Sequence, residues 1–270
     1  MNTNRYLPDT NRVSVLTAIV LLAFALTRLI STTAYTVGFQ AFGRVIRFDL
    51  DLRLLIIILA SGLTASGMDW LLRSHPMLAG KRTIEHWFVP MLTSLVLGVP
   101  FYLLPDGPLW WVAFGAGSIL LVLVFWAEYV VASPGDTSYP LAMVVLIVIS
   151  FALYLILALA LRNANIRLFL QAPALFIATF FVCLRTLHLR LGGRRELAWS
   201  AGIALIGIQL AAGLHYWAIS PVRYGMFLLG LLYALVSLTA SLLEGISLRR
   251  AVFEPSVMLI LVWSAGIWFG

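Results

Sequence analysis

The sequence has little charge and almost no cysteine. Asp, Glu, Lys and Arg make up 11% of the 270 residues and hydrophobic residues 62%, and the mean hydropathy is +1.00. A soluble domain carries about 25% charged and roughly 45–50% apolar residues. Because a water-soluble globule of this size could not hide so much apolar surface, the composition excludes a soluble enzyme, a disordered chain and a fibrous protein. It indicates a chain whose solvent is lipid.

The single cysteine, Cys183, lies inside an apolar run. One cysteine cannot form an internal disulfide, a CxxC pair or a cysteine-based zinc cage, which excludes a thiol–disulfide oxidoreductase. The net charge of +7 comes from basic residues that stand singly or in pairs between apolar runs. Since nucleic-acid binding needs a basic face, we expect no nucleic-acid partner and interpret these residues as topology signals and contacts to lipid headgroups.

Nine apolar runs predict an all-α, polytopic transmembrane bundle that forms a single integral membrane domain over 1–270, with no soluble domain. Continuous runs of this length indicate helices, because barrel strands would be shorter and would alternate apolar with polar residues. The ninth run is short, which leaves eight spans as the alternative. The runs are 13–30, 54–72, 88–104, 109–132, 140–161, 168–184, 198–219, 224–246 and 257–269.

Basic residues in the loops favour a cytoplasmic N-terminus, since cytoplasmic loops carry an excess of Lys and Arg. With that orientation eleven basic residues lie inside: Arg5, Arg12, Arg73, Lys81, Arg82, Arg185, Arg190, Arg194, Arg195, Arg249 and Arg250. Six lie outside: Arg44, Arg47, Arg53, Arg162, Arg167 and Arg223. Charged and apolar residues alternate over 37–53. This stretch predicts either a short amphipathic helix on the membrane surface or an ordinary charged loop.

The densest polar stretch joins the second and third runs. Asp69 and Arg73 are four residues apart, so they can pair on one helix face, and His75 precedes a proline that ends the helix. Glu85 and His86 open the third run, where a carboxylate suits the positive end of a helix. We expect a polar cluster of these five residues at the inner surface, beside Lys81 and Arg82.

Three interpretations of this cluster remain open. It is interfacial capping, a proton- or ion-coupled relay, or a site for a metal or phosphate group. The stretch lacks metal-ligand spacing such as H-E-x-x-H, and we predict no catalytic residue, metal or cofactor. Weaker candidates are Glu128 and Glu244 near the inner ends of the fourth and eighth runs, where both could join the same cluster, and His215 toward the outer end of the seventh.

The segment Ser66-Gly67-Met68-Asp69-Trp70-Leu71-Leu72-Arg73-Ser74-His75-Pro76 resembles an uncharacterised family of bacterial multi-span membrane proteins, a domain of unknown function. The resemblance implies a bacterial inner-membrane location and no particular activity.

We expect transport or permeation of a small solute, an ion or a lipid. One alternative is a membrane-embedded enzyme acting on a lipid headgroup at the cytoplasmic face. Another is a membrane scaffold or subunit without activity of its own. The expected partners are membrane lipids, together with a second copy of the chain or another membrane protein.

Overall fold

The computed structural model describes residues 8–29, 35–41, 44–50, 52–75, 78, 83–105 and 107–269, with the backbone alone for 29, 35–41, 44–50, 54 and 103. Within these residues nine helices are long and apolar enough to cross a membrane, so the predicted all-α bundle is confirmed. The alternative of eight spans is wrong, because the ninth helix, α9 (Leu248–Phe269), begins well before the apolar run at 257–269.

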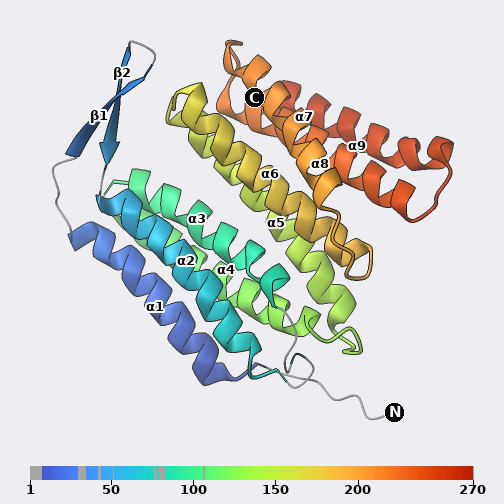
Figure 1. The fold of residues 1–270 in the computed structure, drawn as a ribbon, viewed down its shortest axis with the longest axis horizontal. Helices are drawn as coiled ribbons and strands as arrows, with labels where there is room; N and C mark the ends of the chain where they lie inside the picture. The colour runs from blue at the N-terminus through green and yellow to red at the C-terminus, as the bar shows by residue number, and fades with distance from the viewer. Residues whose placement is uncertain are drawn as a thin grey trace. The chain divides into compact units, whose positions relative to one another are not determined.

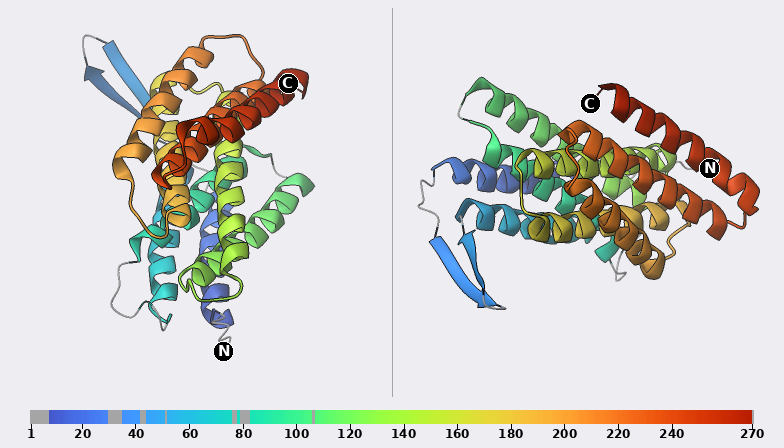
Figure 2. Two further views of the ribbon diagram at one scale, coloured as in Figure 1. Left: turned by 90° about the vertical axis from the view of Figure 1, so that its right-hand side faces the viewer. Right: turned by 90° about the horizontal axis from the view of Figure 1, so that it is seen from above.

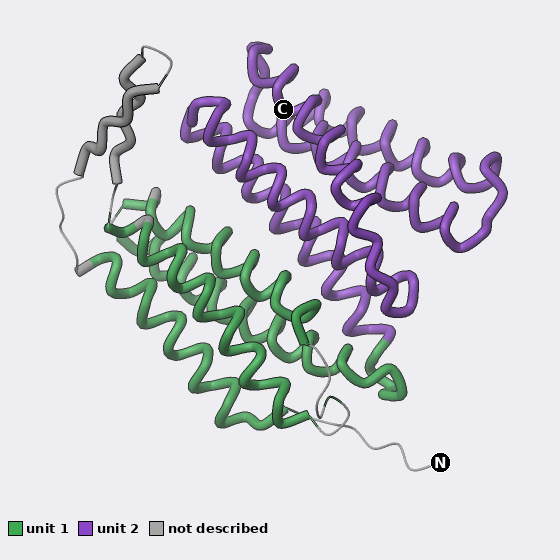
Figure 3. Tube along the Cα trace, in the orientation of Figure 1, with its two compact units in different colours: residues 1–139 green, residues 140–270 purple. Residues whose placement is uncertain are grey.

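The chain packs as two units, residues 1–139 and 140–270 (Figure 3). The first holds four long helices, α1 (Thr10–Leu29), α2 (Leu52–Leu72), α3 (Phe88–Leu103) and α4 (Pro108–Val131), together with the short helix η2 (Ile84–His86) (Figure 1). In this unit α1 packs on α2 and α4, and α3 packs on α2 and α4. The prediction of one membrane domain stays a prediction.

The core of the first unit is built from apolar side chains that recur on the facing sides of its helices. Phe24 of α1 and Phe101 of α3 make an edge-to-face ring contact with centroids 5.1 Å apart. Met68 of α2 and Phe125 of α4 are fully buried in the same cluster. This packing fixes the ends of α2 and α4, which carry the predicted polar residues.

The stretch 37–53 is neither a surface helix nor an ordinary loop. It contributes a β-hairpin, in which β1 (Tyr35–Ala41) pairs antiparallel with β2 (Arg44–Leu50) (Figure 1). The physical reason lies in the sequence: charged and apolar residues alternate with a period of two, which is the period of a strand, and valine, isoleucine and phenylalanine favour strands. The expectation of a surface helix or an ordinary loop is therefore wrong for the residues of the two strands.

The second unit holds α5 (Tyr139–Asn163), α6 (Leu168–Arg190), α7 (Leu197–His215), α8 (Pro221–Leu243) and α9. Helices α8 and α9 run side by side over most of their length (Figure 2), and α6 packs on α7 and α8. Gly245 ends α8 with a φ of +82°, a left-handed conformation that glycine adopts without strain. The amide of Ile246 then donates to the carbonyl of Ser241, which closes the helix end.

Large apolar side chains cover the surface of both units. Ile119 of α4 is 71% exposed and Ile260 of α9 is 65% exposed, and many other Leu, Ile, Val, Phe and Trp side chains are exposed as well. Soluble monomers rarely expose apolar surface on this scale. Together with the nine apolar helices, this surface identifies a multi-pass membrane protein.

Candidate functional site

The predicted polar residues gather at one end of the first unit, where α2 ends, η2 begins and α4 ends. We call this group the first polar cluster; it consists of Asp69, Arg73, His75, Glu85, His86 and Glu128. Five of its members are the residues expected from the second and third runs, and Glu128 joins them from α4. Lys81 and Arg82 lie outside the described residues.

Asp69 connects the end of α2 to the turn before η2. Its Oδ2 lies 2.7 Å from Nε of Arg73, so the predicted pair four residues apart is present. The hydroxyl of Thr83 donates a hydrogen bond to the other carboxylate oxygen. Arg73 is mostly exposed whereas Asp69 is largely covered, which is the arrangement expected of an arginine that reaches toward water from a helix end.

His86 and Glu128 form the buried centre of the cluster. Nδ1 of His86 lies 2.8 Å from Oε2 of Glu128, and their side chains are 10% and 0% exposed. Glu128 lies in the last turn of α4, three residues before Val131. A carboxylate buried in a helical bundle is costly unless it is paired, so the contact with His86 holds η2 against α4.

His75 is also buried, in the loop after α2. Its ring meets the ring of Tyr129 edge-to-face, with centroids 4.6 Å apart. Burial, and secondarily the charge of His86, lower the pKa of His75, while the carboxylate of Asp136 acts in the opposite direction. Asp136 is buried in the loop between α4 and α5, where its Oδ1 accepts a hydrogen bond from the amide of Ser138.

Glu85 is buried in the same short helix as His86. The cluster thus brings two histidines and three carboxylates, those of Asp69, Glu85 and Glu128, to one end of the unit. Among the residues that the structure describes, no three His, Cys, Asp or Glu side chains are placed to hold a metal ion. The chemistry that this arrangement directly supports is proton exchange between imidazole and carboxylate groups.

Sequence reasoning missed three members of this environment. Thr83 gave no signal, because a lone threonine in a loop is common. Tyr129 follows Glu128 directly, and its position next to a candidate carboxylate was the available signal. Asp136 lies in the turn Ser133-Pro134-Gly135-Asp136, where turn chemistry alone explains an aspartate.

The remaining candidates lie in the second unit and have partners there. Nδ1 of His215 lies 2.9 Å from Oε1 of Gln171, whose Nε2 donates to the hydroxyl of Tyr224 at 2.8 Å. Gln171 and Tyr224 are fully buried, so this is an interhelical network among α6, α7 and α8. Glu244 follows the last residue of α8 and lies 3.5 Å from Nη2 of Arg190.

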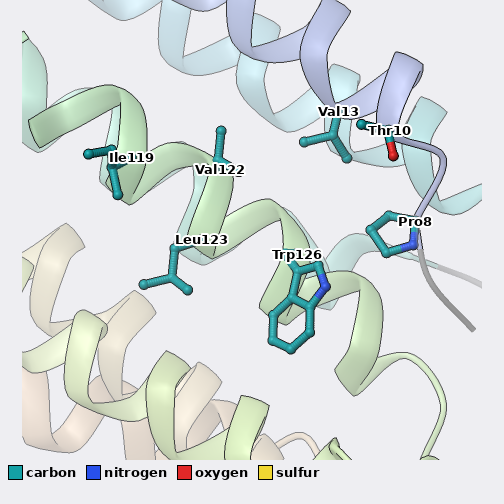
Figure 4. A pocket seen from close by; sticks show the side chains of 7 residues that line it. All are labelled: Pro8, Thr10, Val13, Ile119, Val122, Leu123 and Trp126. Carbon is teal, nitrogen blue, oxygen red and sulfur yellow. The ribbon is translucent and has the colours of Figure 1, made fainter. Parts of the chain in front are cut away.

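An apolar hollow of about 420 Å³ lies between the start of α1 and the second half of α4 (Figure 4). Its lining consists of Pro8, Thr10, Val13, Ile119, Val122, Leu123 and Trp126. None of these described lining residues is ionisable, so together they offer a lipid-like surface and no acid–base chemistry.

Comparison with curated proteins and with solved structures finds no match. A family model described as a protein of unknown function, DUF5656, matches residues 32–269. The match covers eight of the nine helices and the whole first polar cluster. It agrees with the resemblance seen in the segment 66–76. The chain therefore belongs to this family of unknown function, DUF5656.

Proposed function

We propose that this membrane protein moves protons across the bilayer, alone or with a small solute, and that the His86–Glu128 pair is its protonatable site. The observation that carries the proposal is the 2.8 Å contact between a buried imidazole and a fully buried carboxylate. Ionisable groups inside a membrane bundle are costly, and they commonly mark ion and proton pathways.

The surroundings of the pair support proton exchange with water. The charges of His86 and Asp136 act in opposite directions on the pKa of His75, the first lowering it and the second raising it. Asp69 and the largely exposed Arg73 extend the polar groups to the surface of the same end. Polar side chains therefore accompany the His86–Glu128 pair at the end of the unit where α2 and α4 end.

The cellular setting is proposed with the function. The excess of basic residues in alternate loops favours a cytoplasmic N-terminus, which would place the first polar cluster at the cytoplasmic face of a bacterial inner membrane. Its lateral partners would be lipid acyl chains, which suit the apolar hollow of Figure 4.

Proton flux into liposomes tests the proposal. The purified protein is reconstituted with an entrapped pH-sensitive dye, and a potassium gradient with valinomycin supplies the driving force. We expect wild-type vesicles to acidify faster than empty ones. Glu128→Gln, which keeps the size and hydrogen-bonding capacity of the side chain but cannot ionise, should reduce the rate to that of empty vesicles.

Glu196→Gln is the matched control, because Glu196 belongs to the second unit and pairs with the mostly exposed Arg194. It should leave the flux unchanged. Wild-type flux equal to that of empty vesicles, or equal flux in Glu128→Gln and wild type, contradicts the proposal.

A further inference from the structure

A separate series of polar groups runs along α8 in the second unit. Tyr233 and Ser237 of α8, and Glu244 directly after its last residue, recur at helical spacing, so they lie on one side of this helix. Arg190 of α6 reaches this side, with Nη1 3.4 Å from Oγ of Ser237 and Nη2 3.5 Å from Oε1 of Glu244. The hydroxyl of Tyr233 donates to Oε1 of Glu254 in α9 at 2.8 Å. Sequence reasoning did not single out Glu254.

Glu254 lies in the first third of α9, a helix long and apolar enough to cross a membrane. It is the seventh residue of α9, so its Cα is about 9 Å from the helix start at a rise of ~1.5 Å per residue. The hydrocarbon layer is about 30 Å thick, and a helix needs about 20 residues to cross it. Most of the 22 residues of α9 are therefore required for the crossing. Only 11% of this span is buried, and Glu254 itself is exposed. Apart from its hydrogen bond with Tyr233, the side chain is therefore open to whatever surrounds the helix.

Within the part of the chain that the structure describes, no basic side chain forms an ion pair with Glu254. From α8 the hydroxyl of Tyr233 contacts its carboxylate, and Ser237 lies one turn further along α8. Arg190 of α6 is engaged with Ser237 and Glu244. On α9 itself Arg250 lies one turn nearer the helix start. An ionised carboxylate held toward lipid is strongly disfavoured, whereas the neutral acid is tolerated.

We propose that Glu254 is a second proton-binding site, at which a carboxyl group at the lipid-facing surface of α9 reversibly takes up a proton. Oε1 keeps the hydrogen bond from Tyr233, and Oε2 forms the new O–H bond. The proton comes from a hydronium ion at the water-facing end of α8 and α9, leaving water behind, and is returned there on ionisation. This proposal needs no contribution from the first polar cluster.

Labelling with dicyclohexylcarbodiimide tests the site directly. This lipid-soluble reagent attacks protonated carboxyl groups in apolar surroundings and leaves a stable N-acylurea, which peptide mass spectrometry locates. In the full-length protein in liposomes we expect Glu254 to be the labelled carboxyl. Labelling should fall by up to about tenfold per pH unit once the carboxyl ionises. A water-soluble carbodiimide should prefer Glu244 at the helix end.

Two variants sharpen the experiment. Glu254→Gln should abolish the adduct. Tyr233→Phe removes the hydrogen bond to the carboxylate, so labelling at a fixed pH should increase. Absence of an adduct at Glu254 overturns the proposal. This result would be obtained, for example, if a second copy of the chain covered α9. Labelling that does not change with pH overturns it as well. Because no flux is measured, failure here is distinct from failure of the proposed proton transport.

Discussion

Burying a charge without a partner is costly, and this cost determines how much the His86–Glu128 contact contributes to the free energy of unfolding. Removing the imidazole by His86→Ala leaves the fully buried Glu128 without this partner. Breaking a buried pair in this way costs about 3–5 kcal/mol. We expect His86→Ala to lower the free energy of unfolding by that amount, measured by denaturation in detergent micelles.

The matched comparison is Arg194→Ala, which breaks the pair between Arg194 and Glu196. Arg194 is 60% exposed, and a pair of this kind is worth at most about 1 kcal/mol. Equal losses in the two variants would show that the His86–Glu128 pair is not buried in the folded protein.

The buried ring of His75 makes stability depend on pH. Burial and the charge of His86 lower the pKa of His75 from its ordinary value of 6.5, so folding favours the neutral ring. The resulting stability is complete above the unfolded-state pKa and is lost as the pH falls through the lowered folded-state pKa. We expect the wild-type melting temperature to decrease below about pH 6.5.

His75→Phe keeps an aromatic ring against Tyr129 but cannot take up a proton. Its melting temperature should change less than that of wild type over the same acidic range. Parallel curves for the two proteins would rule out His75 as the source of the pH dependence.

At the scale of elements, the sequence predicted helices better than their ends. The run 168–184 predicts a helix that stops before Arg185, but α6 continues to Arg190. Polar residues end an apolar run without ending a helix, because long side chains can reach water from a continuing helix. The hairpin was not predicted because its residues lie between two apolar runs that predict spanning helices. In that setting an amphipathic stretch suggests a surface helix or a loop.

Because α8 and α9 pack closely, we expect the replacement of one glycine of α8 to lower the stability of the protein. A Cβ at Gly230 would lie 2.8 Å from Cδ1 of Trp263, whose indole nitrogen donates to the carbonyl of Phe227. Because the ring is rigid and held in place, Gly230→Ala should destabilise the protein by about 1–3 kcal/mol. Thermal unfolding in micelles measures this.

Gly202 of α7 is the matched control, because a Cβ there meets nothing within 4 Å. Gly202→Ala should be neutral or slightly stabilising, since alanine is the better helix former. A neutral Gly230→Ala would contradict the observed proximity of the two helices.

At the scale of the whole molecule, composition determined the fold class, and loop chemistry located the first polar cluster. Asp69, Arg73, His75, Glu85 and His86 were predictable because they are close in sequence. Glu128 was a weaker candidate that could join the cluster, but its pairing with His86 was not predictable, since the two residues are 42 positions apart and meet through packing that no local pattern encodes. Glu254 was missed because it lies just before the ninth apolar run.

The claim on which the account depends is that the helices cross a bilayer in alternating directions. Cys183 is buried in α6, and replacing it by alanine gives a protein without cysteine. Single cysteines are then introduced at Asn165 and at Arg194, which are both exposed and lie beyond opposite ends of α6. In intact cells, a membrane-impermeant maleimide should label the cysteine at position 165, and that at position 194 only after the membrane is opened. Equal labelling of both from one side would contradict the account.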